Sequence, residues 1–356
     1  MKVTILDVAR RAGVSTATVS NVVNSTGRFS PKTRRCVLNA INDLKYYPNA
    51  HARNLASHRS RILGIIVSDI SNPFFPTLIK SFEERARQHG YEAIVSDTGF
   101  NLKQMMRALE RMLEQKVRGV AIMTSEMSPA SIKTFLAQDI AVTFLDVGLV
   151  GRNTSNISLD YFSGVNQVVE HLYQLGHRLI AFVAGPSRLK NVLARQRAYV
   201  HSMTSLGLEP SPIVRQNMTY KGGYKAGLRI ARMSPRPTAV ITVNDFIATG
   251  VVKGLYSCDL RVPKDVSVVG FDNTWLAQTF IPALTSVDVH ADLIGRTAAD
   301  SLLRVSSPSE PMAKEYPISL HLVVRESTGT VSQNGVVRSR YAHASPPDPE
   351  GIVLTF

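Results

Sequence analysis

The hydrophobic pattern near the N-terminus predicts three short helices. Thr4 and Asp7 form a capping box at the start of the first helix, and Gly13 can end it in the left-handed conformation. Ser15 is placed to cap the second helix, and Ser30-Pro31 to start the third. Two sets of apolar residues fall on inward faces: Val8, Val14, Val19 and Val22 in the first two helices, and Val37, Leu38, Ile41 and Leu44 in the third.

From residue 62 onward the pattern changes to short runs of Val, Ile and Leu that alternate with helical runs. Seven strands are predicted, at residues 62–69, 91–96, 119–124, 141–146, 179–184, 238–243 and 266–271. Segment 153–158 is interpreted as irregular. Continuous apolar strands separated by helices are typical of parallel sheets buried on both faces. The roughly 270 residues of this region exceed one small layered sheet, so two α/β lobes are expected.

Charge distinguishes the two regions. The chain of 356 residues has a net charge of +14, and residues 1–61 hold 11 Lys and Arg against two acids. A small basic module is typical of a protein that binds the phosphate backbone of nucleic acid, although charge alone fits a merely basic surface equally well. Two distant cysteines and the absence of an apolar run of 18 residues exclude a disulfide scaffold and a membrane span. We therefore expect a cytoplasmic, nucleoid-associated protein.

The second predicted helix carries residues suited to a DNA groove. Two helices joined by a tight turn can present the second to a major groove. There Asn21 can pair with adenine and the Ala17 methyl can contact thymine, while the hydroxyls of Ser15 and Thr18 suit phosphate oxygens. The same pattern also occurs in ordinary three-helix bundles.

A basic linker follows the third helix and contains one isolated apolar residue, Leu55. Pro48 ends the preceding helix, and Asn49 can start a brief new one. Leu55 is either a stray surface residue or a wedge inserted between base steps in the minor groove.

Two motifs carry a family resemblance. The run Leu-Asp-Val-Ala-Arg-Arg-Ala-Gly-Val-Ser-Thr-Ala-Thr-Val-Ser-Asn-Val-Val-Asn at residues 6–24, and the segment from Tyr47-Pro48-Asn49 to Leu55, resemble the headpiece and hinge of the lactose-repressor and purine-repressor family. The resemblance implies a homodimer on a palindromic double-stranded DNA operator, with Leu55 intercalated. With the hydroxyl residues Ser15 and Thr18 included, the expected DNA contacts are Ser15, Thr16, Ala17, Thr18, Asn21, Asn24, Asn49, Ala52 and Leu55.

The body resembles the same family in four segments, at residues 71–75, 268–272, 281–285 and 324–328. The resemblance implies two Rossmann-like, periplasmic-binding-protein-like lobes with three crossovers. It divides the chain into a helix-turn-helix headpiece (1–48), a hinge helix and linker (49–61) and an effector-binding and dimerisation domain (62–330). Within that domain the near lobe is 62–160 and 290–322, and the far lobe is 161–289 and 323–330. The Ser- and Pro-rich tail 331–356 is expected to be disordered.

Polar residues that follow predicted strands indicate a ligand cleft, because open α/β sheets bind ligands beyond the carboxyl ends of their strands. Asp and Asn suit a polyol, Arg adds a planar fork, and aromatic rings add an apolar wall. The family resemblance implies an effector site formed by Phe74, Phe75, Asp146, Asp160, Arg195, Met218, Asn244 and Asp272. An Asp after a strand can instead cap a helix, as for Asp245, and Asp160 depends on the irregular segment. The expected effector is a sugar or sugar derivative, ahead of a nucleobase or nucleoside.

Catalysis is the main competing function. The chain lacks a Walker A motif, a G-x-S-x-G elbow, H-E-x-x-H and C-x-x-C, and its nine histidines show no metal-ligand spacing. A transport binding protein would share the two-lobed body but not the basic headpiece. We therefore predict a ligand-responsive transcriptional repressor that is not an enzyme and needs no cofactor or metal.

Overall fold

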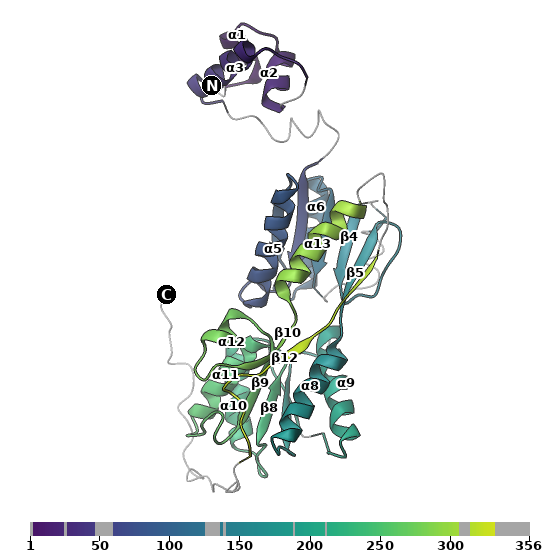
Figure 1. Cartoon of the computed structure of the whole chain (residues 1–356), viewed down its shortest axis with the longest axis vertical. Coiled ribbons are helices and arrows are strands. Elements are labelled where there is room, and N and C mark those ends of the chain that lie inside the picture. The colour runs from purple at the N-terminus through teal and green to yellow at the C-terminus, as the bar shows by residue number, and fades with distance from the viewer. Residues whose placement is uncertain are drawn as a thin grey trace.

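The N-terminal headpiece contains three helices, α1 (Ile5–Ala12), α2 (Thr16–Asn24) and α3 (Pro31–Asp43) (Figure 1). The computed structural model describes residues 3–24, 27–46, 60–124, 136–137, 140–187, 189–210, 212–305 and 314–331. The Asp7 carboxylate accepts a hydrogen bond from the Thr4 backbone N–H at 2.9 Å, and Gly13 has a φ of 67°. The three helices therefore begin at the predicted residues, and α1 ends as predicted before Gly13, whereas α3 already ends at Asp43, before Pro48.

A small core holds these helices together, with Val8, Val19, Val22 and Val37 buried in it. The prediction for Leu38 was wrong, because its side chain is 44% exposed. Residues 37, 40, 41 and 44 follow the helical i, i+3, i+4, i+7 spacing, so Ala40 faces the core and Leu38 is turned away from it.

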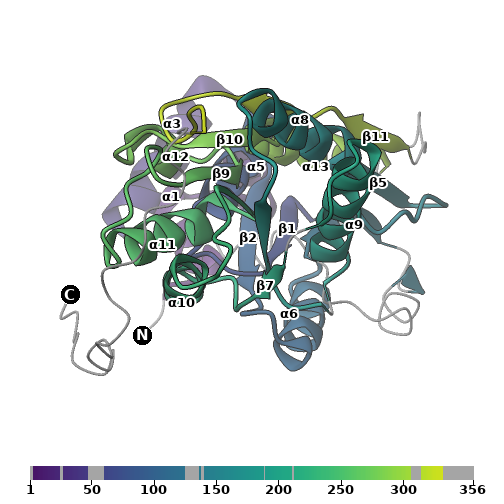
Figure 2. The same ribbon diagram turned by 90° about the horizontal axis from the view of Figure 1, so that it is seen from below.

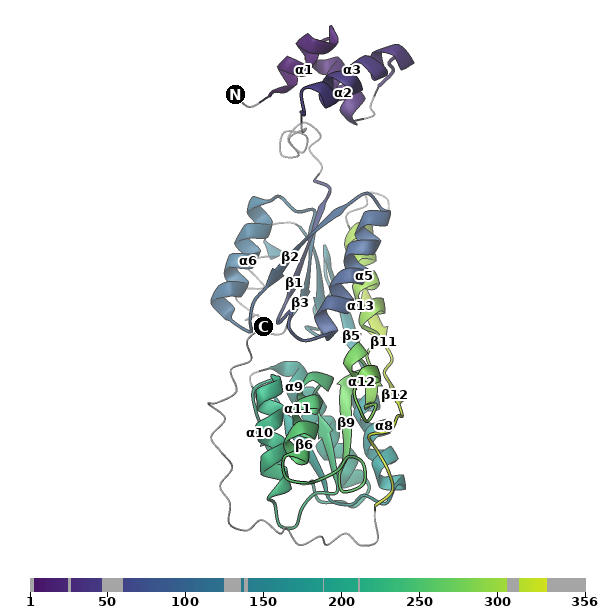
Figure 3. The same ribbon diagram turned by 90° about the vertical axis from the view of Figure 1, so that its left-hand side faces the viewer.

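The near lobe is a six-stranded parallel sheet in the order β11-β5-β4-β3-β1-β2. Its strands are β1 (Ile62–Val67), β2 (Glu92–Asp97), β3 (Gly119–Met123), β4 (Ala141–Leu145), β5 (Thr154–Leu159) and β11 (Glu315–Ile318). Helices α5 (Phe74–Gln88) and α13 (Ala291–Val305) cover one face, and α6 (Leu102–Glu114) covers the other (Figure 3). Strands β1 and β3 are almost wholly buried, as a sheet covered on both faces requires.

The far lobe repeats this plan in the order β12-β10-β9-β8-β6-β7, and only β12 is antiparallel to its neighbour. Its strands are β6 (Ile180–Ala184), β7 (Ile213–Arg215), β8 (Ala239–Thr242), β9 (Ser267–Asp272), β10 (Thr285–Asp288) and β12 (His321–Val323). Helices α8 (Tyr161–Gln174) and α9 (Lys190–Ser205) lie on one face (Figure 2). On the other face lie α10 (Tyr220–Ala231) and α11 (Asp245–Tyr256), with the short α12 (Trp275–Thr279) beyond them. The predicted fold class, two doubly wound lobes after a helical headpiece, is confirmed.

The chain passes between the two sheets three times, after β5, after β10 and between β11 and β12. The predicted near-lobe segment 290–322 runs too far, because His321 and Leu322 already belong to β12 of the far sheet. The third crossing lies between Ile318 and His321.

The segment interpreted as irregular is in fact β5. Thr154, Ser155 and Asn156 are polar but buried, so the strand lacks the apolar run that marks the others. Their partners come from neighbouring elements: Asn156 donates to the Glu315 carboxylate at 2.8 Å and accepts from the Val147 N–H at 3.1 Å. The unpredicted β7, β10, β11 and β12 have only three or four residues each, too few for a periodic signal. No helix among the described residues is long and apolar enough to cross a membrane.

Candidate DNA-binding surface and effector pocket

The outer face of α2 carries the predicted base-reading residues. Thr16, Ala17 and Asn21 are exposed, whereas Val19 and Val22 on the inner face are buried. Residues 17 and 21 are four positions apart and therefore lie on the same side of the helix, and residue 16 borders that side. A helix face of small and hydrogen-bonding side chains can approach base edges closely in a major groove.

Ser15 and Thr18 hold the start of α2. The Thr18 N–H donates to the Ser15 hydroxyl oxygen at 3.1 Å, and the two hydroxyl oxygens lie 2.9 Å apart. Ser15 is therefore the N-cap of α2, and its contact with phosphate remains a prediction. The side chain of Asn24, and the hinge residues Asn49, Ala52 and Leu55, lie outside the described residues, so their DNA contacts also remain predictions.

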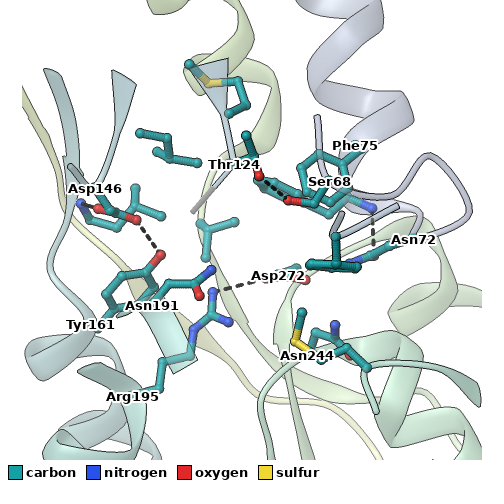
Figure 4. A pocket seen from close by; sticks show the side chains of 17 residues that line it. Ser68, Asn72, Phe75, Thr124, Asp146, Tyr161, Asn191, Arg195, Asn244 and Asp272 are labelled. Carbon is teal, nitrogen blue, oxygen red and sulfur yellow. Dashed lines mark hydrogen bonds and ion pairs between the residues drawn. The ribbon is translucent and has the colours of Figure 1, made fainter. Parts of the chain in front are cut away.

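A pocket lies between the carboxyl ends of the two sheets (Figure 4). The open space within the pocket and its mouth amounts to about 640 Å³. The near lobe lines it with Ser68, Asn72, Phe74, Phe75, Phe100, Met123, Thr124, Leu145, Asp146 and Leu159. The far lobe and the second crossover add Tyr161, Asn191, Arg195, Met218, Asn244, Asp272 and Val289. Seven of the eight predicted effector residues thus line one cavity.

Arg195 and Asp272 form the charged part of this pocket. Both side chains are less than a tenth exposed, and the guanidinium Nη2 lies 3.7 Å from the carboxylate Oδ1. Burial raises the pKa of Asp272 well above its ordinary value, and the nearby positive charge of Arg195 opposes that rise. Arg195 also donates from Nη1 to the Val243 carbonyl at 2.9 Å, while its Nε has no partner among the described residues. One buried donor of the guanidinium is therefore left unsatisfied.

Asp146 occupies the opposite wall and is held by uncharged donors. Its carboxylate accepts from the Tyr161 hydroxyl at 2.5 Å and from the Leu159 N–H at 2.9 Å. Burial raises the pKa of Asp146, and these two hydrogen bonds oppose the rise. Burial and the charge of Asp146 raise the pKa of Tyr161 well above its ordinary value, so Tyr161 stays a donor.

Phe74 and Phe75 form an apolar wall at the start of α5. Their ring centroids are 5.0 Å apart at 74°, an edge-to-face pair, and both rings also belong to the main core. Asn244 caps α11 by accepting from the Ile247 N–H at 2.8 Å, which leaves its amide nitrogen as the donor available to a ligand.

Asp160 does not line the pocket, so that prediction was wrong. Its carboxylate accepts from the Ser163 N–H at 3.0 Å and caps α8 on the exposed side. The extended chain at the end of β5 turns alternate side chains to opposite sides. Leu159 and Tyr161 therefore face the cavity and Asp160 faces away from it.

Asp245 is a structural residue although it follows a strand. It is fully buried and accepts from the Thr274 N–H at 2.7 Å and from the Ser286 hydroxyl at 2.5 Å. Burial raises its pKa to about 6. It joins α11 to the chain after β9 and to β10, and does not line the pocket.

Five polar lining residues escaped prediction: Ser68, Asn72, Thr124, Tyr161 and Asn191. Ser68 and Thr124 directly follow β1 and β3, and the Ser68 hydroxyl donates to that of Thr124 at 2.9 Å. Their position after a strand was an available signal, as it was for Asp146. Asn191 lies one helical turn before Arg195, which was a second signal.

Comparisons with known proteins agree with both halves of this description. Residues 4–49 match the family model "Bacterial regulatory proteins, lacI family", and residues 169–328 match "Periplasmic binding protein-like domain". The chain is 31% identical to the HTH-type transcriptional regulator DegA of Bacillus subtilis, over 93% of this chain and all of DegA.

Two solved structures extend the likeness to the fold. A lac repressor dimer bound to operator and the anti-inducer ONPF has a TM-score of 0.82 and 29% identity, covering 93% of this chain and all of that one. A complex of the transcriptional regulator CelR with cellobiose has a TM-score of 0.68 and 26% identity, covering 92% of this chain and all of that one.

Proposed function

The chain belongs to the LacI family of bacterial regulatory proteins and is a DNA-binding transcriptional regulator, and on this premise we propose that it is a repressor controlled by a sugar or sugar derivative bound between its lobes. The observation that carries the proposal is the mixed lining of the pocket. Two carboxylates, a guanidinium and an asparagine amide surround one cavity next to two phenylalanine rings. A polyhydroxylated ring needs acceptors and donors around its edge and an apolar surface against its face.

One relative of known structure supports the sugar class. CelR, at 26% identity, forms a complex with cellobiose. A nucleobase or nucleoside is the alternative, since Asp and Asn also pair with ring nitrogens.

The DNA side of the proposal uses the headpiece. A homodimer, as in the lac repressor complex, would place two α2 helices in successive major grooves of a palindromic operator. Thr16, Ala17 and Asn21 would read bases and Leu55 would wedge the central step. Such a protein acts in the cytoplasm, on the nucleoid.

Ligand and operator are coupled through lobe closure. A ligand that contacts both lobes has a different affinity for open and closed arrangements, and only that difference can shift operator affinity. Coupling free energies of this kind are typically about 1–3 kcal/mol. The relatives are regulators rather than enzymes, and we propose no catalytic step.

The first test is selection of bound sequences from random duplex DNA at about 0.15 M salt, where weak backbone binding is suppressed. We expect a palindrome of roughly 14–20 base pairs with a flexible pyrimidine–purine centre. That operator then reports an effector screen by fluorescence anisotropy, with sugars in one set and nucleobases and nucleosides in another. Failure to enrich any motif, with and without pooled ligands, would contradict the proposal.

A matched pair of variants tests the pocket. Asp272→Ala should remove the ligand response and leave unliganded operator binding nearly unchanged, whereas Asp160→Ala should keep both. A full response in Asp272→Ala would mean that the ligand binds elsewhere.

The hinge has its own test. Leu55→Ala should weaken specific binding far more than non-specific binding, because it removes the wedge and no charge. Equal losses on both kinds of DNA would contradict the wedge.

A further inference from the structure

We propose that Asp288, His290 and His321 form a binding site for a first-row transition-metal ion such as Zn²⁺ or Co²⁺. Their ligand atoms lie within 4.8 Å of one another, and no other group of three His, Cys, Asp or Glu residues in the described part of the chain converges in this way. The Asp288 Oδ2 atom is 3.7 Å from His290 Nδ1 and 3.9 Å from His321 Nε2. Two imidazoles and one carboxylate suit Zn²⁺ and its neighbours in the first row.

The separations between Asp288 and the two histidines require only a small adjustment to hold a metal ion. Ligand atoms about 2.0–2.2 Å from a tetrahedral Zn²⁺ lie about 3.4 Å from each other. The two measured separations exceed this by less than 0.6 Å, a change that side-chain rotation supplies. His321 is 54% exposed and His290 31%, so solvent reaches the site and a water can complete the coordination.

The backbone brings the three side chains together. Asp288 and His321 are directly opposite each other in the antiparallel pair of β10 and β12. The His290 N–H donates to Asp288 Oδ1 at 2.8 Å, and a φ of 55° at His290 turns its ring toward His321, with 4.7 Å between ring centroids. The site is therefore built from a fixed strand register and a fixed turn.

A second layer of hydrogen bonds orients the carboxylate. Asn273 Nδ2 donates to Asp288 Oδ2 at 3.0 Å, and Asn273 Oδ1 accepts from Arg325 at 2.6 Å. Arg325 is thus engaged by Asn273 and by the Leu284 carbonyl. Among the described residues, the basic side chains in contact with the Asp288 carboxylate are those of the two histidines. Partners of this kind fix the direction of metal ligands.

The position of the site gives the ion a structural consequence. Asp288 and His290 lie on the second crossover between the lobes, and His321 follows the third. An ion held by all three ties two crossovers together. Val289, between two of the ligands, and Asp272, next to Asn273, both line the pocket.

Titration of untagged full-length protein, stripped with EDTA, tests the site directly. Co²⁺ is followed by its visible absorption, with Zn²⁺ as competitor. We expect one high-affinity ion per protomer, and at least tenfold weaker binding in His290→Gln, His321→Gln and Asp288→Asn. His89→Gln, which changes an exposed histidine of the near lobe, should bind as the wild type does.

The variants separate this site from histidines at 51, 58 and 343, outside the described residues. Saturable binding that survives in the His290→Gln/His321→Gln double variant, or no saturable binding up to 1 mM metal, would overturn the proposal. A thermal scan without metal checks that each variant is folded, and added Zn²⁺ should raise the melting temperature of the wild type and of His89→Gln only.

A second measurement examines the consequence for regulation, and this part rests on the proposed function. Zn²⁺ should change effector affinity in the wild type and not in His321→Gln, because only the wild type has its crossovers tied. If the metal binds as expected but does not change effector affinity, the coupling between metal and effector is rejected while the metal site itself is retained. Failure of the proposed function would be detected separately, because the effector screen with operator DNA would then identify no effector.

Discussion

The two lobes share one strand order, yet they hold equivalent aspartates in different ways. Asp146 follows β4 and Asp272 ends β9, the fourth strand of each lobe, and both have a positive φ, of 56° and 103°. Asp146 is fixed by two uncharged donors, whereas Asp272 faces the guanidinium of Arg195. Backbone position therefore places each carboxylate at the cavity, while the neighbouring side chains decide whether it is a rigid acceptor or half of an ion pair.

The largest effect is expected from Arg195→Met, which removes the charged partner of the far-lobe aspartate, Asp272. The change leaves Asp272 buried without its counter-charge, so the free energy of unfolding should fall by about 3–5 kcal/mol and the ligand response should be lost. Chemical denaturation measures the first effect and operator anisotropy the second. Arg197→Met, on the exposed side of the same helix, is the matched control, and equal losses in both variants would contradict a special role for Arg195.

The next effect is a pH dependence caused by Asp245, which follows the third strand of the far lobe. Burial raises its pKa from 3.8 to about 6, so the folded state binds a proton more tightly than the unfolded state does. Stability should therefore rise as the pH falls from about 6 to about 4, by at most ~3 kcal/mol from this group. Denaturation midpoints across this range check the sign.

Asp245→Asn should reduce that pH slope. The raised pKa values of Asp146 and Asp272 contribute with the same sign, so a shallower slope is expected rather than a flat profile. An unchanged slope in Asp245→Asn would show that the dependence arises elsewhere.

A smaller effect is expected from Tyr161→Phe, which removes one of the two hydrogen-bond donors that hold Asp146 in the near lobe. Asp146 loses its hydroxyl donor and keeps the Leu159 N–H, at a cost of about 1–3 kcal/mol. Effector affinity should fall because the carboxylate is no longer fixed. Tyr256→Phe, at an exposed tyrosine, is the control and should change neither the stability nor the effector affinity. Titration calorimetry with the identified effector measures the affinity of both variants, and equal affinities would contradict the role of Tyr161.

The smallest change is expected in Asp160→Ala. Loss of the cap on α8 should lower the free energy of unfolding by about 1 kcal/mol without altering effector affinity. A fall in affinity comparable to that of Tyr161→Phe would return Asp160 to the binding site.

The positions of Asp146 and Asp272 after strands were readable from the sequence, but the directions of their side chains were not. Asp146 and Asp272 were predicted because parallel strands gather their carboxyl ends at one edge. Asp160 was predicted from the family resemblance alone, and β5, with its polar Thr154, Ser155 and Asn156, was not recognised as a strand. Because the strand was not recognised, the alternation of its side chains between the two sides could not be used to show that Asp160 faces away from the cavity.

The sequence by itself determined the elements whose signals are local. Caps at Thr4, Ser15 and Ser30 set the starts of the headpiece helices, each through a hydrogen bond to a residue three positions later. Runs of consecutive apolar residues mark the central strands. Both signals involve only residues that are neighbours in the chain. Only the tertiary structure decided which distant side chains meet. Arg195 reaches Asp272, and His321 reaches Asp288 and His290, through sheet register and lobe crossovers that join residues far apart in sequence, and no spacing rule along the chain encodes those contacts.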